Sequence, residues 1–360
     1  MALFTFDVFV ALAIGSCVGI ILQRGRVCSN TAFRNLLLAR NSELMLIIIF
    51  TIIIELIGYQ LLAIISIPGF NFRSNPIPFS FVLLPIGSFL FGVGTVIAGG
   101  CAGGVCYRVG EGSIKSLLAL LGFAIGIGIL TVQPLSNFTK ELRDTTSWMI
   151  EGKVPSLELF FPRWIWTLSA IILLFSVIYY YKQQTRELTH LLPNWTPIVS
   201  GVLLGILGII ARFSSTLAGR EFGFSTTDGI GELFTIIANI IGFIPSSQFS
   251  LSWAGFFIIG LILGAALSSF HIREFKIKIP AKNDVLRFFG GGFILGIGAI
   301  LALGCNFGHI LGGIPELGLS SFFALLFMIF GNWFGSYIIY TVLKQSIPES
   351  TPSTSFTLTL

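Results

Sequence analysis

The sequence contains very little charge for its length. Only 10% of its 360 residues are Asp, Glu, Lys or Arg, against about a quarter in an average soluble domain. So few charged side chains cannot cover the surface of a water-soluble globule of this size. With 54% hydrophobic residues and a mean hydropathy of +0.92, the composition excludes a soluble enzyme, a disordered chain and a nucleic-acid-binding protein. The solvent that suits this chain is lipid.

Metal ligands and redox motifs are also scarce. The chain has three histidines, His190, His271 and His309, and its five cysteines include no C-x-x-C pair. An odd number of cysteines excludes a complete disulfide framework, and metal ligation lacks partners. We therefore expect no metal and no cofactor. A membrane thiol oxidoreductase is disfavoured, because no histidine pair for a quinone or haem is visible either.

The start of the chain lacks the pattern of a signal peptide. No Lys or Arg precedes the apolar run from Leu3 to Leu22, and this run contains Asp7. A signal peptide begins with basic residues and ends at a small-residue cleavage site. We expect the run to be retained as the first membrane-spanning helix.

Long apolar runs are what the chain has in abundance. A spanning helix needs about 20 mostly apolar residues, and nine segments qualify: 4–22, 44–67, 80–98, 116–135, 164–181, 197–212, 253–270, 286–303 and 320–343. Four intervening stretches mix Gly, Ser, Cys or Asn with short apolar pieces, as re-entrant half-helices do: 23–43, 99–115, 213–252 and 304–319. The predicted fold is an all-α integral membrane protein of about nine transmembrane helices and four re-entrant half-helices.

The basic residues predict an orientation. Connections on one side of the nine spans hold about twice as many Lys and Arg as those on the other, which places the richer side in the cytoplasm. The N-terminus is then outside, the C-terminus is in the cytoplasm, and the connection 136–163 is external. We expect a multi-pass protein of the inner, cytoplasmic membrane.

The chain contains an internal repeat. FLFGVGTVIAGGCAGG matches FILGIGAILALGCNFG at a constant offset that places Gly100 and Cys101 on Gly304 and Cys305. The copies lie an odd number of spans apart, so the repeat is inverted, as in many transporters. The predicted division is a first repeat (1–135), an external loop with a linker span and a cytoplasmic loop (136–196), a second repeat (197–345) and a flexible tail (346–360).

Three cysteines occupy the predicted breaks. Cys28, Cys101 and Cys305 each stand before a predicted half-helix, next to backbone-permissive residues such as Gly100 and Gly304. The start of a helix presents unpaired N–H groups and a partial positive charge, which attract anions. A thiol there is a soft, weak S–H donor. Such a path suits a soft, sulfur-containing anion.

Other polar residues are secondary candidates for the path. Arg24 and Arg26 would reinforce the attraction for anions, although anchoring on the cytoplasmic side explains them as well. Asn306 shares the break of Cys305, and His309 follows one helical turn later. Glu55 lies inside the second span, where a carboxylate is a functional hypothesis by default.

Four motifs in order resemble the YeeE/YedE family of sulfur-compound transporters: LQRGRVCSNTAFR, GGCAGGVCYRVGEG, GREFGFSTT and ALGCNFGHILGGI. The resemblance implies nine spans with four half-membrane helices in an hourglass-shaped monomer. It also implies thiosulfate uptake through essential cysteines, which are Cys28, Cys101 and Cys305 here. A small cytoplasmic TusA-like sulfurtransferase is the partner that the resemblance implies, and some family members are linked to selenium.

The function expected from the sequence is thiosulfate import through a cysteine-lined path, not enzymatic catalysis. Three alternatives stay open at this stage. The first is a transporter or channel for another small sulfur- or selenium-containing anion, the second is a membrane thiol oxidoreductase, and the third is a structural membrane subunit. The last leaves the matched Gly-Cys pairs unexplained.

Overall fold

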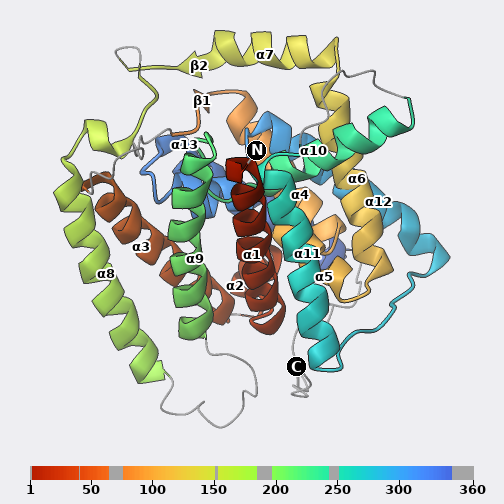
Figure 1. The fold of residues 1–360 in the computed structure, drawn as a ribbon, viewed down its shortest axis with the longest axis horizontal. Helices are drawn as coiled ribbons and strands as arrows, with labels where there is room; N and C mark the ends of the chain where they lie inside the picture. Colours follow the sequence, from red (N-terminus) through yellow and green to blue (C-terminus); the bar gives the residue numbers. More distant parts are fainter. Residues whose placement is uncertain are drawn as a thin grey trace.

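The computed structural model describes residues 2–39, 41–64, 76–150, 153–184, 197–242 and 251–342. Its long helices, shown in Figure 1, are α1 (Ala2–Arg24), α3 (Glu43–Ile64), α4 (Leu83–Ile97), α6 (Ile114–Thr131), α8 (Arg163–Gln184), α9 (Pro197–Leu217), α11 (Trp253–His271), α12 (Lys282–Leu301) and α13 (Leu319–Ser336). The predicted tail 346–360 and His190 lie outside the described residues. So do four of the basic residues that count toward the predicted orientation: Arg40, Arg73, Arg186 and Lys344.

The all-α membrane fold predicted from the apolar runs is confirmed. A long helix occupies each of the nine predicted segments, and eight apolar stretches within the described residues are long enough to cross a membrane. The exception is α8, whose apolar part, Trp164–Tyr179, is shorter. It lies at the edge of the molecule in Figure 1. Helix α6 ends at Thr131, before Pro134 and before the predicted end at residue 135. Helix α13 continues as a π-helix, η3 (Tyr337–Val342), and the two together match the predicted span 320–343 up to the last described residue.

A short helix occupies each of the four predicted breaks. These are α2 (Ser29–Leu38), α5 (Ala102–Gly110), α10 (Thr226–Ile240) and the π-helical η2 (Phe307–Gly313). The chain turns sharply before two of them, where Gly99 and Leu303 take positive φ angles of 74° and 63°. A leucine rarely adopts this backbone conformation. That these helices are re-entrant remains a prediction.

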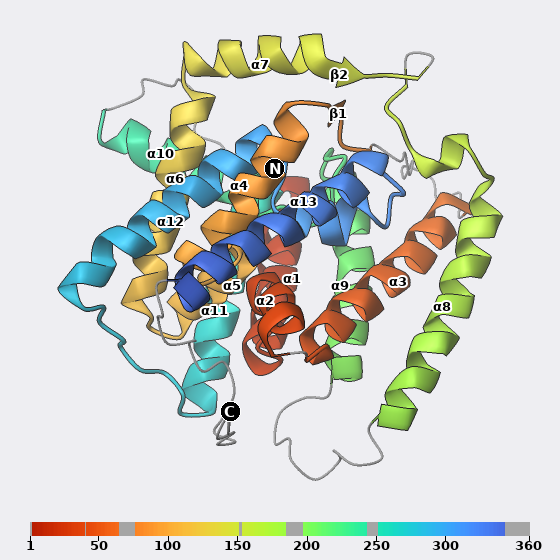
Figure 2. The same cartoon turned by 180° about the vertical axis from the view of Figure 1, so that it is seen from behind.

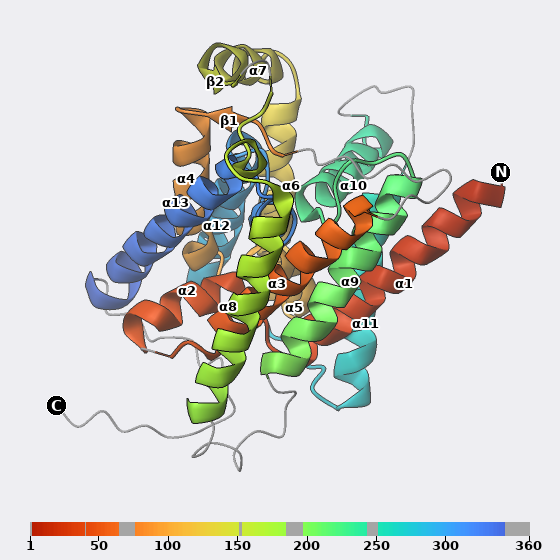
Figure 3. The same cartoon turned by 90° about the vertical axis from the view of Figure 1, so that its left-hand side faces the viewer.

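One face of the molecule carries a horizontal helix, α7 (Leu135–Thr146), which lies across the ends of the long helices in Figures 1 and 3. A short antiparallel ribbon follows it, in which β1 (Phe79–Ser80) pairs with β2 (Ser147–Trp148). A single 3₁₀ turn, η1 (Leu157–Leu159), precedes α8. The described part of the predicted external connection, 136–150 and 153–163, therefore forms a layer on this face.

The long helices of the two halves contact one another in matched pairs. In the predicted repeat, α1, α3, α4 and α6 correspond to α9, α11, α12 and α13. Helix α1 contacts α11, and the corresponding pair α9 and α3 is also in contact. Helix α4 contacts α13, and the corresponding pair α12 and α6 is also in contact; Figure 2 shows α4, α12 and α13. Glycines permit the close approach. A Cβ at Gly94 of α4 would meet the backbone of Leu295, and one at Gly298 of α12 would meet that of Phe91. That the halves are inverted copies remains a prediction.

Candidate functional site

Two cysteines from different helix starts meet in the core. Cys28 precedes α2, Cys101 precedes α5, and their Sγ atoms lie 3.5 Å apart. The backbone N–H of Cys101 donates to the Sγ of Cys28 at 3.5 Å, and that of Gly104 donates to the Sγ of Cys101 at 3.3 Å. Each cysteine is 1% exposed. We call Cys28 and Cys101 the thiol pair.

The third cysteine meets a hydroxyl at the corresponding place in the second half. Cys305 precedes η2 and is fully buried, and its Sγ lies 2.8 Å from the Oγ1 of Thr226, the first residue of α10. Ser225 caps α10, since its hydroxyl accepts the N–H of Asp228. We call Cys305 and Thr226 the thiol–hydroxyl pair. The offset in the sequence predicts the place of Cys305 but not this partner.

Apolar side chains surround a small cavity beside the thiol pair. A cavity of about 20 Å³, bordered by the thiol pair, also touches Leu204, Phe307 and Leu311. We call this closed region the neck. Its volume suits about one water molecule, which is too small for a polyatomic anion. Asn306 joins the sides of the neck, because its Nδ2 donates to the Ser29 Oγ at 2.9 Å.

A larger cavity of about 510 Å³ opens beneath α7. We call it the vestibule. Gly304, the residue before Cys305, lines it, together with Thr227 of α10. The Thr227 hydroxyl is buried and has no hydrogen-bond partner among the described residues, which leaves a donor for a ligand.

The vestibule has two basic side chains from α7. Lys140 and Arg143 line it, and an Nη of Arg143 donates to the backbone carbonyl of Ile300 at 3.3 Å. Burial lowers the pKa of Arg143, against the opposing effect of Asp144, but arginine stays charged in proteins. Sequence reasoning did not name either residue as a candidate. The amphipathic pattern of 135–146 indicates a surface helix and could have pointed to them.

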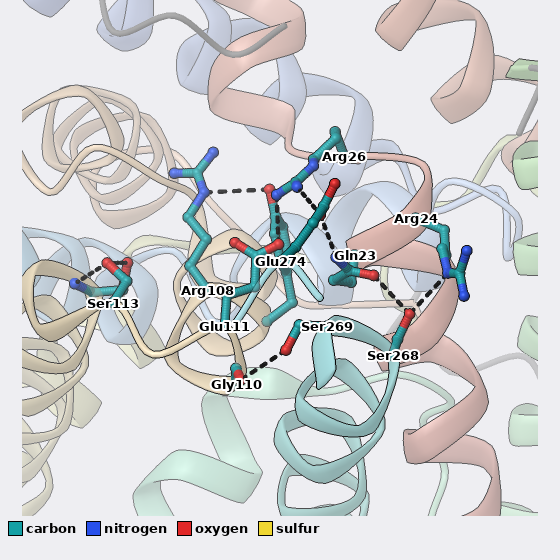
Figure 4. A network of polar contacts seen from close by, with 12 residues as sticks. Gln23, Arg24, Arg26, Arg108, Gly110, Glu111, Ser113, Ser268, Ser269 and Glu274 are labelled. Carbon is teal, nitrogen blue, oxygen red and sulfur yellow. Dashed lines mark hydrogen bonds and ion pairs between the residues drawn. The ribbon is translucent and has the colours of Figure 1, made fainter. Parts of the chain in front are cut away.

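Arg24 and Arg26 have polar partners within the protein. Figure 4 shows them in a polar network beside α11 and the segment after it. The Arg24 Nε donates to the Ser268 Oγ at 3.0 Å, and Arg26 forms ion pairs with Glu111 and Glu274. The charge of Arg26 is therefore largely balanced by two carboxylates.

Arg108 lies beside the two glycines that precede Cys101. Its guanidinium folds back from α5 and donates to the Gly99 carbonyl, and its charge acts on Cys28. It lies beside Gly100, because a Cβ at that glycine would be 3.0 Å from an Nη of Arg108. Sequence reasoning counted Arg108 only toward orientation. Arg108 lies in the last turn of α5, seven residues after Cys101, and from there a long side chain can extend back to the glycines before α5.

His309 has a partner for each ring nitrogen. Its Nδ1 lies 3.1 Å from the Ser321 Oγ and its Nε2 2.9 Å from the Ala302 carbonyl, so both ring nitrogens are engaged. The ring packs under Gly304 and does not line either cavity. Among the described residues, no group of His, Cys, Asp and Glu is arranged to hold a metal ion.

The fold and its apolar helices define a multi-pass membrane protein with buried thiols at helix starts. A family profile described as sulphur transport matches residues 24–334. The chain therefore belongs to this sulphur transport family, and the YeeE/YedE resemblance is confirmed.

Two relatives match over nearly their whole length. The chain is 35% identical over 345 residues to a thiosulfate transporter TsuA from Spirochaeta thermophila, covering 92% of this chain and 99% of the relative. It is 27% identical to the TsuA of Escherichia coli K12, covering 91% and 94%. A probable transporter YedE from Salmonella typhimurium is 32% identical over 83 residues only, 23% of this chain and 21% of that protein.

Proposed function

We propose that this chain carries thiosulfate into the cell across the cytoplasmic membrane, along a path of buried thiols. The observation that supports this best is the convergence of four helix starts, at which all three candidate cysteines make polar contacts. The names of its full-length relatives support thiosulfate as the substrate and transport, not catalysis, as the activity.

In this proposal the vestibule opens to the outside, as the distribution of Lys and Arg predicts. Two of the carboxylates that line it, Asp228 and Glu316, form ion pairs with Arg220 and Arg212. Lys140 and Arg143 then exceed Asp144 by one positive charge, which attracts anions. Gly304 leaves the backbone open beside Cys305, and the Thr227 hydroxyl offers a free donor. The anion reaches the thiol–hydroxyl pair from this side.

The thiols replace part of the hydration shell in the neck. An S–H group donates weakly to the oxygens and terminal sulfur of thiosulfate, and a soft sulfur contact is polarisable. The anion moves from Cys305 past Asn306 to Cys101 and Cys28 without any bond to a cysteine. At the thiol pair the N-termini of α2 and α5 and the charge of Arg108 stabilise it.

The matched helix contacts support an inverted repeat, with 1–135 and 197–345 as the two copies. An inverted repeat with four re-entrant helices brings helix starts to the midplane from both sides, in an hourglass shape. We also propose that the N-terminus lies outside, that the C-terminus lies in the cytoplasm, and that a TusA-like sulfurtransferase receives the imported anion.

Growth on thiosulfate as the sole sulfur source tests the proposal. The chain should rescue a bacterial strain that lacks thiosulfate uptake, and radiolabelled thiosulfate should accumulate in the rescued cells. Cys101→Ala should fail to rescue while reaching the membrane in equal amount. Rescue on selenium compounds but not on thiosulfate would contradict the proposed substrate.

A further inference from the structure

Glu55 is a buried carboxyl that the proposed path does not use. It lies in α3 and is fully buried, and neither of its carboxyl oxygens has a hydrogen-bond partner among the described residues. A glycine of the neighbouring helix makes room for it, because a Cβ at Gly208 would overlap its Oε1. An unpaired carboxylate charge is costly in this surrounding. The group is therefore neutral and carries a proton in this conformation.

Glu55 lies on a face of α3 that extends from the neck to the vestibule. Thr51, Glu55 and Tyr59 are four residues apart, so they lie on one face of α3, each about 6 Å from the next. Thr51 lines the cavity of the thiol pair. The Tyr59 hydroxyl is 3.2 Å from the place of a Cβ at Gly223, which lines the vestibule. Glu55 thus lies between the vestibule and the neck.

The charged groups that face this position come from two other elements. Helix α9 provides Arg212 and the turn after η2 provides Glu316, which form a buried ion pair with Nε and Oε1 2.8 Å apart. Both of them and Glu55 act electrostatically on Tyr59, and Glu316 lines the vestibule. Helix α8 contacts α3 through apolar side chains, Ala170 among them, and Arg34 of α2 lies against Tyr340 instead.

We propose that Glu55 is a proton-binding site that couples thiosulfate uptake to the influx of protons. This inference rests on the proposed function. Thiosulfate carries two negative charges, so its import opposes a membrane potential that is negative inside, and a proton moving with it offsets part of that opposition.

The proton balance of this step is simple. Glu55 keeps its proton while the anion occupies the neck, because a nearby dianion disfavours a second negative charge, and releases it toward the cytoplasmic water once the anion has left the thiol pair. It regains a proton from vestibule water by way of Glu316 and the Tyr59 hydroxyl. A proton leaves the external water and reaches the cytoplasmic water, and only O–H bonds break and form.

Proteoliposomes with the purified full-length chain test this proposal. Radiolabelled thiosulfate measures influx, and a pH-sensitive dye inside measures proton movement. Glu55→Gln keeps the shape of the side chain but cannot release a proton. Glu43→Gln, at the start of the same helix, is the matched control.

In the wild type and in Glu43→Gln, thiosulfate influx should acidify the lumen. An inside-alkaline gradient of one pH unit should raise accumulation about tenfold for each proton carried. Glu55→Gln should show neither acidification nor stimulation by the gradient. Tyr59→Phe, which keeps the aromatic ring, should slow the coupled acidification several-fold and serves where Glu55→Gln does not fold.

Thiosulfate influx without acidification in the wild type would overturn the coupling while leaving the transport function intact. Wild-type coupling in Glu55→Gln, or in Tyr59→Phe where that variant is the readout, would also overturn it. The absence of thiosulfate influx in wild-type proteoliposomes under every gradient would overturn the proposed function and this inference together.

Discussion

The thiol pair and the thiol–hydroxyl pair occupy similar places in the two halves but differ in chemistry. In the second half a hydroxyl caps α10, because Ser225 accepts the N–H of Asp228. In the first half Cys28 stands at the same cap position of α2 and makes no capping hydrogen bond. Cysteine is not among the preferred N-cap residues. The thiol of Cys28 therefore contacts Cys101 and does not stabilise the start of α2 by capping it.

The largest effect is expected from removing the thiols. Cys28→Ala, Cys101→Ala and Cys305→Ala should each reduce thiosulfate uptake to background, because each deletes an S–H contact along the neck. A buried cysteine is a small hydrophobic residue, so the amount of folded protein in the membrane should change little.

Cys17 provides the control for these variants. It lies exposed on α1, away from both pairs, and Cys17→Ala should transport like the wild type. Equal uptake by all four variants, measured with radiolabelled thiosulfate, would leave the cysteines a packing role only.

Cys28→Ser tests whether the difference between the halves matters. The substitution gives α2 the cap that α10 has, so it should preserve or raise helix stability by about 1 kcal/mol. Uptake should nevertheless stay far below the wild type, since a hydroxyl lacks the polarisable sulfur. Full activity in Cys28→Ser would make the softness of sulfur irrelevant at this position.

Thr226→Val addresses the thiol–hydroxyl pair and should have a moderate effect. It keeps the shape of the side chain but removes the hydroxyl beside the Cys305 Sγ. Losing one hydrogen bond of about 0.5–1.5 kcal/mol corresponds to a reduction in uptake of roughly two- to tenfold. Thr226→Ser, which retains the hydroxyl, is the control and should remain close to the wild type.

The smallest effect is expected at the vestibule. Arg143→Gln should raise the KM for thiosulfate several-fold with little change in the maximal rate. The reason is that Arg143 attracts the anion into the vestibule but does not border the cavity of the neck. Salt should reduce the difference between this variant and the wild type. Lys278→Gln removes an equal charge from an exposed position outside the vestibule and should leave the KM unchanged.

Local patterns in the sequence predict much of the architecture. Apolar runs predict the long helices, and Gly-rich breaks predict the four short helices between them. The repeat predicts that Gly94 and Gly298 occupy similar places, and each meets the backbone of the opposite half. These features depend on periodicity and backbone freedom, which neighbouring residues determine.

Side-chain partners far apart in the chain could not be predicted in this way. Arg26 looked available to an anion, but Glu274 lies 248 residues away in sequence and pairs with it. His309 looked like a path residue one turn after Cys305, yet Ser321 and the Ala302 carbonyl engage its ring. Such contacts depend on how distant elements pack, and no local pattern records that.

Labelling of the cysteines from each side tests the path most directly. A membrane-impermeant thiol reagent is added outside intact cells, and mass spectrometry follows the modification of each cysteine. Cys305 should react before Cys101 and Cys28, and saturating thiosulfate should slow its reaction. The order should reverse in inside-out vesicles, because the neck blocks the reagent. Equal labelling of Cys305 and Cys101 from one side, with no protection by thiosulfate, would contradict a path that reaches these thiols from opposite faces.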